Sequence, residues 1–311
     1  MLLAGGADSP VGRGLAERLV AGGACVHSAD GRHLHVPSVT NHHLPAAESA
    51  FLLAVARIVR EHGIWLVIPL GYVANQWISA GRSILGREVR VIAPGLGPAT
   101  LVRDRLVALS TLSNHEVAVT RFAVPSDFSD VRAALRELGG RFVLRPRFVS
   151  DCGDTVLVGA PGDVDWTKLD DSSLIQQPGP GSRYVVVIRR PLHGGHRLTV
   201  VLEKSTGRGD SDSDVAVARV ENSRTVAKVE RVAQGAVRAL GLTGVVEVQV
   251  AVGSDGDPMV VDVAVGFGPH SLAVPELVES VLADAPQAAP DVLVAARAGR
   301  GRVRRFVMSA P

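Results

Sequence analysis

The sequence predicts an α/β fold in which a domain with a parallel sheet comes first and a part with mixed helices and strands follows. Short apolar strands alternate with amphipathic helices over roughly the first 100 residues, the pattern of a parallel sheet with helices on both faces. Residues 94–98, with two prolines and two glycines, then break this periodicity and indicate a domain boundary. Beyond them the chain is richer in strands and includes two strands joined by a turn over residues 245–265.

The elements follow one another in a regular order. The first strand is predicted at residues 2–4, and a turn with glycines leads from it into a helix that ends near Val20. Further strands of the first domain are predicted at residues 24–28, 65–69 and 89–93, with a helix at 51–62. In the second part, helices are predicted near residues 101–112, 127–138 and 226–240, and strands at 141–148, 155–158, 183–190, 197–203, 215–221, 245–252 and 258–265.

The composition excludes several classes of function. The chain has 33 Lys plus Arg against 31 Asp plus Glu and only 4% aromatic residues, so it lacks the basic, aromatic-rich character of many nucleic-acid-binding proteins. Its 2 cysteines, Cys25 and Cys152, provide no disulfide framework. It contains no run of about 18 apolar residues, and its start does not resemble a signal peptide. We therefore expect a cytoplasmic protein without a nucleic-acid or membrane partner.

The turn after the first strand has two interpretations. Its spacing of Gly6, Ser9 and Gly12 approximates a dinucleotide-binding turn, with serine at the middle position. It equally fits a tight turn that lets a helix pack on the sheet. A short-chain dehydrogenase would need a catalytic tyrosine with a lysine four residues later. The only tyrosines, Tyr72 and Tyr184, lack such a lysine, so the sequence disfavours this NAD(P)-binding alternative.

Polar residues punctuate the second part in a characteristic order. They are Asp104-Arg105 at the start of a helix, Arg145-Pro146 on a strand, the polar loop 150–154, Gln176-Gln177 before a proline- and glycine-rich turn, and Gln249 and Asp262 on the last two strands. This succession resembles the ATP-grasp superfamily, and within it the carbamoyl phosphate synthetase large-subunit-like branch. The resemblance covers about residues 1–280 and rests on order and spacing, since no single motif is strong.

The resemblance implies a Rossmann-like pre-ATP-grasp domain over residues 1–97 and an ATP-grasp fold over residues 98–284. The latter would consist of two α+β subdomains, at about 98–175 and 176–284. Residues 285–311 would be a basic, solvated tail.

The resemblance also implies a nucleotide site. Arg105 and Arg145 match the family's two phosphate-contacting cations, a role that suits the guanidinium fork, although each could instead be a surface cation with a buried stem. Ser150 and Gly153 lie where the family has a flap over the phosphates. Gln176 and Gln177 correspond to the hinge strand whose backbone faces the adenine edge, and Arg183 falls near the expected ribose position.

Three oxygen-bearing side chains are the predicted magnesium ligands. Gln249 and Asp262 match the family's metal-holding positions, and Glu247 shares the face of Gln249 because strand side chains alternate. We expect Arg145 and Asp262 to act in catalysis. The last strand departs from the family pattern, however, because Ala264 replaces an asparagine ligand and Gly266 an arginine. Further departures are Gln177 in place of a hinge glutamate, Arg183 in place of an acid, and the added flap charges of Asp151 and Asp154.

Histidines crowd the segment after the second strand, namely His33, His35, His42 and His43, with His193 and His196 further on. Imidazole suits zinc, but no cysteine or carboxylate accompanies them in a known spacing, so the sequence favours solvated loop histidines.

The first functional hypothesis is an ATP-dependent ligase that uses ATP and Mg²⁺ to activate a small carboxylate as an acyl phosphate for attack by an amine. The second is a degenerate, non-catalytic ATP-grasp protein that binds a nucleotide or a partner protein. A homodimer is compatible with either.

Overall fold

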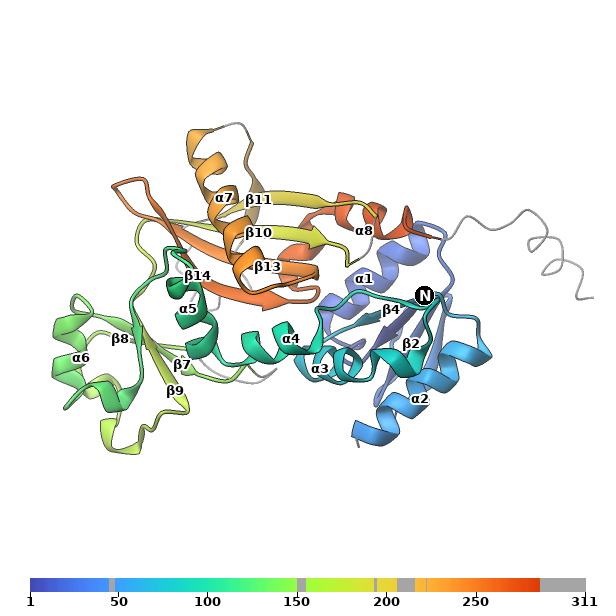
Figure 1. The fold of residues 1–311 in the computed structure, drawn as a ribbon, viewed down its shortest axis with the longest axis horizontal. Coiled ribbons are helices and arrows are strands. Elements are labelled where there is room, and N and C mark those ends of the chain that lie inside the picture. The colour runs from blue at the N-terminus through green and yellow to red at the C-terminus, as the bar shows by residue number, and fades with distance from the viewer. Residues whose placement is uncertain (45–47, 150–154, 193–194, 206–215, 222, 286–311) are drawn as a thin grey trace, which may run out of the picture.

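The structure, a computed structural model, describes residues 1–44, 48–149, 155–192, 195–205, 216–221 and 223–285. These residues form one parallel and two antiparallel sheets (Figure 1). Along the molecule, the sheet that comes last in the sequence lies between the other two. The predicted α/β class is confirmed. None of the described helices is both long and apolar enough to span a membrane.

The parallel sheet has the strand order β3-β2-β1-β4-β5. Its strands are β1 (Leu2–Ala4), β2 (Val26–Asp30), β3 (Val39–His43), β4 (Leu66–Pro69) and β5 (Arg90–Val91). Its helices are α1 (Pro10–Ala21), α2 (Glu48–Glu61) and α3 (Tyr72–Ala80), followed by the 3-10 helix η1 (Arg82–Leu85). Alternation along β1 divides the core, because Leu3 packs with α1 whereas Leu2 packs with α2 and α3.

Strand β3 was not predicted. Its sequence, Val-Thr-Asn-His-His, contains a single apolar residue, and the strand lies at the edge of the sheet with no residue fully buried. An edge strand needs no apolar run, so hydrophobic patterning gives no signal there. The observed β2 also begins two residues later than predicted.

The second sheet is preceded by two helices where one was predicted. These are α4 (Leu96–Arg103), which starts inside the predicted linker, and α5 (Arg105–Asn114). Asp104 separates them, because its extended backbone ends α4 and its carboxylate caps the first turn of α5. The sheet, in the order β6-β9-β7-β8, consists of β6 (Phe122–Ala123), β7 (Phe142–Pro146), β8 (Val156–Val158) and β9 (Ser173–Gln176). Helix α6 (Val131–Glu137) accompanies it, together with η2 (Pro125–Asp127), η3 (Pro161–Asp163) and η4 (Trp166–Lys168).

The third sheet has the order β12-β11-β10-β13-β14. Its strands are β10 (Ser182–Arg190), β11 (Leu198–Lys204), β12 (Val217–Arg219), β13 (Gly244–Val252) and β14 (Pro258–Val265). Helix α7 (Arg224–Ala239) covers one face, and the chain continues through η5 (Pro269–Ala273) to α8 (Pro275–Leu282).

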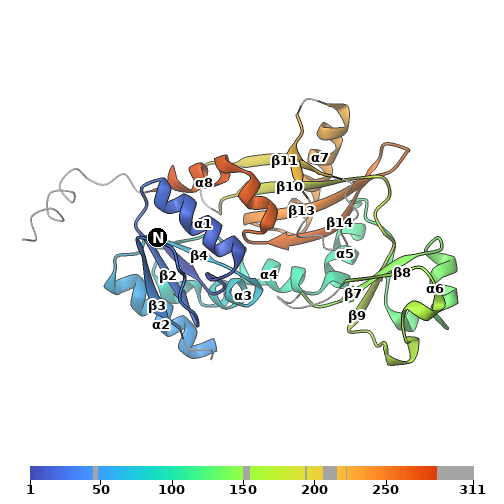
Figure 2. The same ribbon diagram turned by 180° about the vertical axis from the view of Figure 1, so that it is seen from behind.

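The two faces of the third sheet belong to different cores. Val186 and Val248 pack in the core under α7. Val185 and Val187, which point the other way, share a core with Leu3 of the parallel sheet and with α1 and α8. The third sheet is therefore fixed to the first domain, and the second sheet lies at the far end of the molecule in both views (Figures 1 and 2).

Candidate functional site

An ion cluster joins the second sheet to the third. Arg145 on β7 donates through Nη1 to Oδ2 of Asp262 on β14 over 2.9 Å, and through Nη2 to the carbonyl oxygen of Val261 over 3.1 Å. The Nε atom of Arg105, the first residue of α5, lies 3.7 Å from the same Asp262 oxygen. The three side chains are 10 to 18% exposed. Two positive charges thus share one carboxylate, which leaves the cluster with a net charge of about +1.

The start of α5 is fastened to β7, and this places Arg105 beside Arg145. The backbone N–H of Arg105 donates to the carbonyl oxygen of Arg147 over 2.9 Å, and Nη1 of Arg105 donates to the carbonyl oxygen of Pro146 over 2.6 Å. Arg147 in turn forms a forked pair with Asp104, the residue that caps α5.

Burial and neighbouring charges shift the pKa values of Asp104 and Arg105. Burial opposes the charge of Asp104, but hydrogen bonds from Arg147 and from the backbone N–H of Val107 hold the pKa of this carboxyl below its ordinary value. Burial lowers the pKa of Arg105, and the neighbouring Asp262 carboxylate partly offsets that effect. A guanidinium titrates so far above neutrality that Arg105 stays charged.

Gln249 lies directly opposite Asp262 in the pairing of β13 with β14. Residues opposite each other on paired strands project from the same face, so the amide and the carboxylate are neighbours on the face turned away from α7. Oε1 of Gln249 lies 3.5 Å from Nζ of Lys204, a buried lysine on β11. Two of the three predicted metal ligands are therefore brought together, with a cation beside them.

Glu247, the third predicted ligand, is engaged within the protein. Its Oε1 accepts hydrogen bonds from the backbone N–H and the hydroxyl of Ser271, both over 2.7 Å, and its Oε2 lies 3.0 Å from Nδ1 of His270. The side chain is 6% exposed. A Cβ atom on Gly268 would lie 2.5 Å from the carboxylate, so glycine is needed where η5 folds over it. Glu247 thus holds the turn that follows β14.

The backbone at Gly266 leaves little room for the arginine that the resemblance would place there. This residue has a φ of 93°, a conformation that other residues adopt at a cost. A Cβ atom there would lie 2.9 Å from Nδ2 of Asn75 on α3. The chain passes so close to the first domain that an arginine side chain could not be added without rearrangement.

Of the remaining predicted site residues, the structure describes Gln176, Gln177 and Arg183. Gln176 is buried, and its amide donates to the Thr120 hydroxyl over 2.6 Å and to the Val261 carbonyl oxygen over 2.8 Å, which ties β9 to β14. The backbone N–H of Gln177 donates to the carbonyl oxygen of Arg121. Arg183 is exposed on β10. Ser150, Gly153 and the flap acids Asp151 and Asp154 lie outside the described residues.

Two backbone N–H groups of the glycine turn after β1 donate hydrogen bonds to side chains of the protein. The N–H of Ala7 donates to Oδ2 of Asp30 over 2.7 Å, and Ser9 caps α1 by accepting from the N–H of Gly12. A Cβ atom on Gly12 would lie 2.4 Å from the carbonyl oxygen of Ala7, so glycine lets the helix approach the turn. These contacts support the interpretation as a packing turn.

No protein-family model and no curated protein matches the sequence. The structure, in contrast, is similar to several solved structures. It matches the L-amino acid ligase from Bacillus licheniformis with a TM-score of 0.69 at 14% identity, over 90% of this chain and 72% of the ligase. It matches the N5-carboxyaminoimidazole synthetase from Staphylococcus aureus complexed with ADP with a TM-score of 0.64 at 14% identity, over 85% of this chain and 69% of that one.

A third similar structure is the D-alanine–D-alanine ligase from Bacillus anthracis. Its TM-score is 0.61 at 13% identity, and the match covers 91% of this chain and 95% of the ligase. At these identities the likeness establishes the fold, and it does not single out the carbamoyl phosphate synthetase-like branch. The chain has the fold of the ATP-grasp superfamily.

Proposed function

We propose that the protein is an ATP-dependent ligase that activates a small carboxylate as an acyl phosphate for attack by an amine. The observation that carries this proposal is the cluster of Arg105, Arg145 and Asp262 between the second and third sheets. The Nε atoms of both arginines are buried and donate no hydrogen bond to any group that the structure describes. A buried donor without a partner costs free energy, and a phosphate oxygen would satisfy it.

The charge of the cluster suits a polyphosphate. Guanidinium groups bind phosphate oxygens in a forked geometry, and this site is shielded enough from water to strengthen the attraction. We assign Arg145 and Arg105 to the phosphates. Arg145 must then exchange part of its contact with Asp262 for one with the nucleotide. Gln176, Gln177 and Arg183 are proposed to border the adenine and ribose, with Ser150 and Gly153 over the phosphates.

The same face offers oxygen donors for magnesium. This ion commonly takes one or two carboxylates and completes its shell with substrate phosphates and water. Gln249 and Asp262, paired across β13 and β14, fit a minimal site of this kind. Glu247 is proposed to support that face through the turn it holds. When bound, magnesium would neutralise charge on the phosphoryl group that is transferred.

The proposed reaction has two steps. A carboxylate oxygen of the substrate attacks the γ-phosphorus, the bond to the β,γ-bridging oxygen breaks, and ADP leaves. The amine then attacks the acyl carbon and displaces inorganic phosphate, losing a proton. In the first step, Arg145 stabilises the charge on the equatorial phosphoryl oxygens. This matters because catalysis of phosphoryl transfer is mainly electrostatic.

A second candidate is a nucleotide-binding protein without turnover. It is favoured by the engagement of both carboxylates, since Asp262 contacts two guanidinium groups and Glu247 is held by Ser271 and His270. Ala264 also offers no ligand. On this reading the arginines bind phosphate but the transferring group is not activated.

Calorimetry with ATP and magnesium tests both candidates. We expect Arg145→Ala to weaken ATP binding by about 10- to 100-fold, because it removes charge-assisted hydrogen bonds worth roughly 1.5–3 kcal/mol. Arg136→Ala, which changes an exposed arginine on α6, is the matched control and should bind as the wild type does. Absence of binding at millimolar ATP would refute both candidates. If ATP binds, ADP release in a screen of carboxylates with amines supports the ligase, and its absence supports the second candidate.

A further inference from the structure

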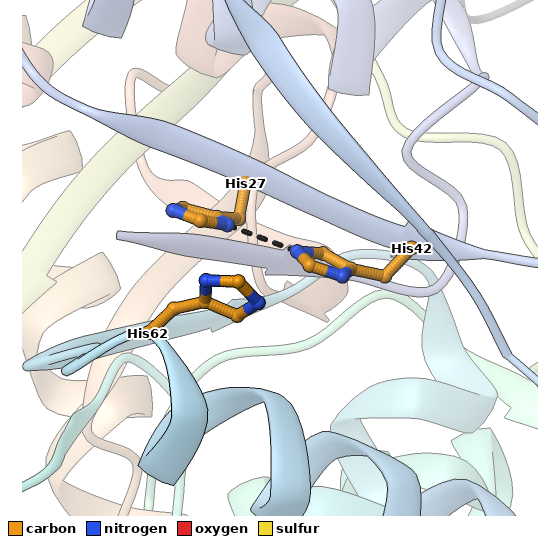
Figure 3. Close-up of side chains that lie close together, drawn as sticks. All are labelled: His27, His42 and His62. Atoms are coloured by element: carbon orange, nitrogen blue, oxygen red, sulfur yellow. Dashed lines mark hydrogen bonds between the residues drawn. The ribbon is translucent and has the colours of Figure 1, made fainter.

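Three histidines from separate elements of the first domain meet at one place. His27 lies on β2, His42 on β3, and His62 directly follows α2. Each offers a ring nitrogen, and these atoms all lie within 4.8 Å of one another. Nδ1 of His27 and Nε2 of His42 are 2.9 Å apart, and Figure 3 shows the His62 ring beside both.

The fold dictates this meeting. In the parallel register, His27 pairs with Thr40 and His42 pairs with Ala29, so His27 and His42 project from the same face of the sheet. Helix α2 covers that face and ends at Glu61, which delivers His62 to the two strand histidines. The ring centroid of His62 lies 4.8 Å from the ring centroid of each partner.

The electrostatics favour neutral imidazoles. Burial, followed by the neighbouring His42 and His62, lowers the pKa of His27 to about 4. Burial, followed by His62, also lowers the pKa of His42. His27 and His42 are therefore uncharged at neutral pH, and the neutral imidazole is the state that binds a metal ion.

One ring is also oriented. Sγ of Cys25 lies 3.7 Å from Nε2 of His27, the nitrogen that faces away from His42. A proton on Nε2, donated to this sulfur, would leave Nδ1 as the ligand, in the way that outer partners orient metal-binding histidines.

We propose that His27, His42 and His62 form a binding site for a divalent transition metal, with zinc as the ion whose preferences match best. Three imidazole nitrogens with one open position are a common zinc ligand set. Tetrahedral zinc would hold the nitrogens about 3.3 Å apart, so His27 and His42 need to separate only slightly. His62 is exposed and can adjust its ring.

This site differs from the predicted one. Of the four histidines that the sequence grouped after the second strand, His42 takes part, whereas His33, His35 and His43 are exposed and absent from the cluster. His193 lies outside the described residues. The cluster lies in the parallel-sheet domain, at the opposite end of the molecule from β7 in both views (Figures 1 and 2). It is therefore separate from the proposed nucleotide site, and the proposal does not depend on the ligase.

The test uses the full chain without a histidine tag, stripped of metal with a chelator. Zinc is titrated by calorimetry and by competition with a chromogenic chelator, while thermal unfolding is followed in parallel. We expect one zinc ion per chain and a rise in melting temperature, because the metal binds the folded state. His62→Ala should weaken zinc binding by at least about 100-fold, since it removes a direct ligand.

His62 is exposed, so its replacement leaves the fold intact, and circular dichroism checks this. His42→Asn provides a second ligand variant, and His35→Ala is the matched control, because His35 is an exposed histidine of the same segment. Equal loss of zinc in the His35 variant, or unchanged binding in the His62 variant, would overturn the proposal by showing that scattered surface imidazoles bind the ion. So would the absence of stoichiometric binding to the wild type.

Discussion

Asp262→Asn separates the two roles that Asp262 is proposed to play. In the structure, Oδ2 of its carboxylate lies 2.9 Å from Nη1 of Arg145 and 3.7 Å from Nε of Arg105. The asparagine keeps the size but removes the charge, so both guanidinium groups become available to phosphate. A charge-assisted hydrogen bond is worth roughly 1.5–3 kcal/mol, so magnesium-free ADP should bind about 10- to 100-fold more tightly.

The same substitution removes the only carboxylate of the proposed metal pair. Turnover with magnesium and ATP should therefore fall by about 100-fold or more, since each 1.4 kcal/mol of lost transition-state stabilisation costs tenfold in rate. Calorimetry in EDTA measures the first effect and a coupled ADP-release assay the second. Asp257→Asn, on the exposed turn between β13 and β14, is the control. Weaker magnesium-free binding together with unchanged turnover would show that Asp262 neither competes with phosphate nor binds magnesium.

Three further substitutions test contacts that support the elements around the site. Gly266→Ala should lower the free energy of unfolding by about 1–3 kcal/mol, because the left-handed backbone and the contact with Asn75 both oppose a Cβ atom; a urea denaturation midpoint equal to the wild type's would contradict this. Glu247→Gln should cost about 1–3 kcal/mol, measured in the same way, because the Ser271 N–H and hydroxyl lose a charged acceptor. The pKa of Asp104 is depressed, so its stabilisation is present above its ordinary value near 3.8 and is lost as pH falls through the folded-state value. Acid denaturation should show this loss in the wild type and not in Asp104→Asn, and identical profiles would argue against it.

Hydrophobic patterning predicted the strands and the helix that present a continuous apolar run or face to the core. The buried runs of β1, β4, β10 and β13 and the amphipathic helix α7 all lie close to their predicted positions. Patterning failed where a single polar residue decides the structure. Asp104 ends one helix and caps the next, which an apolar count cannot detect, although an aspartate followed by a new apolar stretch is a capping signal.

The candidate site was predicted only as a set of residues. Sequence spacing placed Gln249 and Asp262 on facing strands, and the register agrees. It could not show that Glu247 turns to Ser271, because that contact depends on how η5 folds back over the strand. Nor could it find His27 and His62, since each stands alone in the sequence and meets His42 only through the packing of α2 on the sheet.

We propose that ATP phosphates bind between the second and third sheets, on Arg105 and Arg145. A crystal structure of the protein with a non-hydrolysable ATP analogue and magnesium tests it most directly. We expect phosphate oxygens within hydrogen-bonding distance of both guanidinium groups and a metal ion beside Gln249 and Asp262. Phosphates bound elsewhere, with the Arg145–Asp262 pair unchanged, would contradict it.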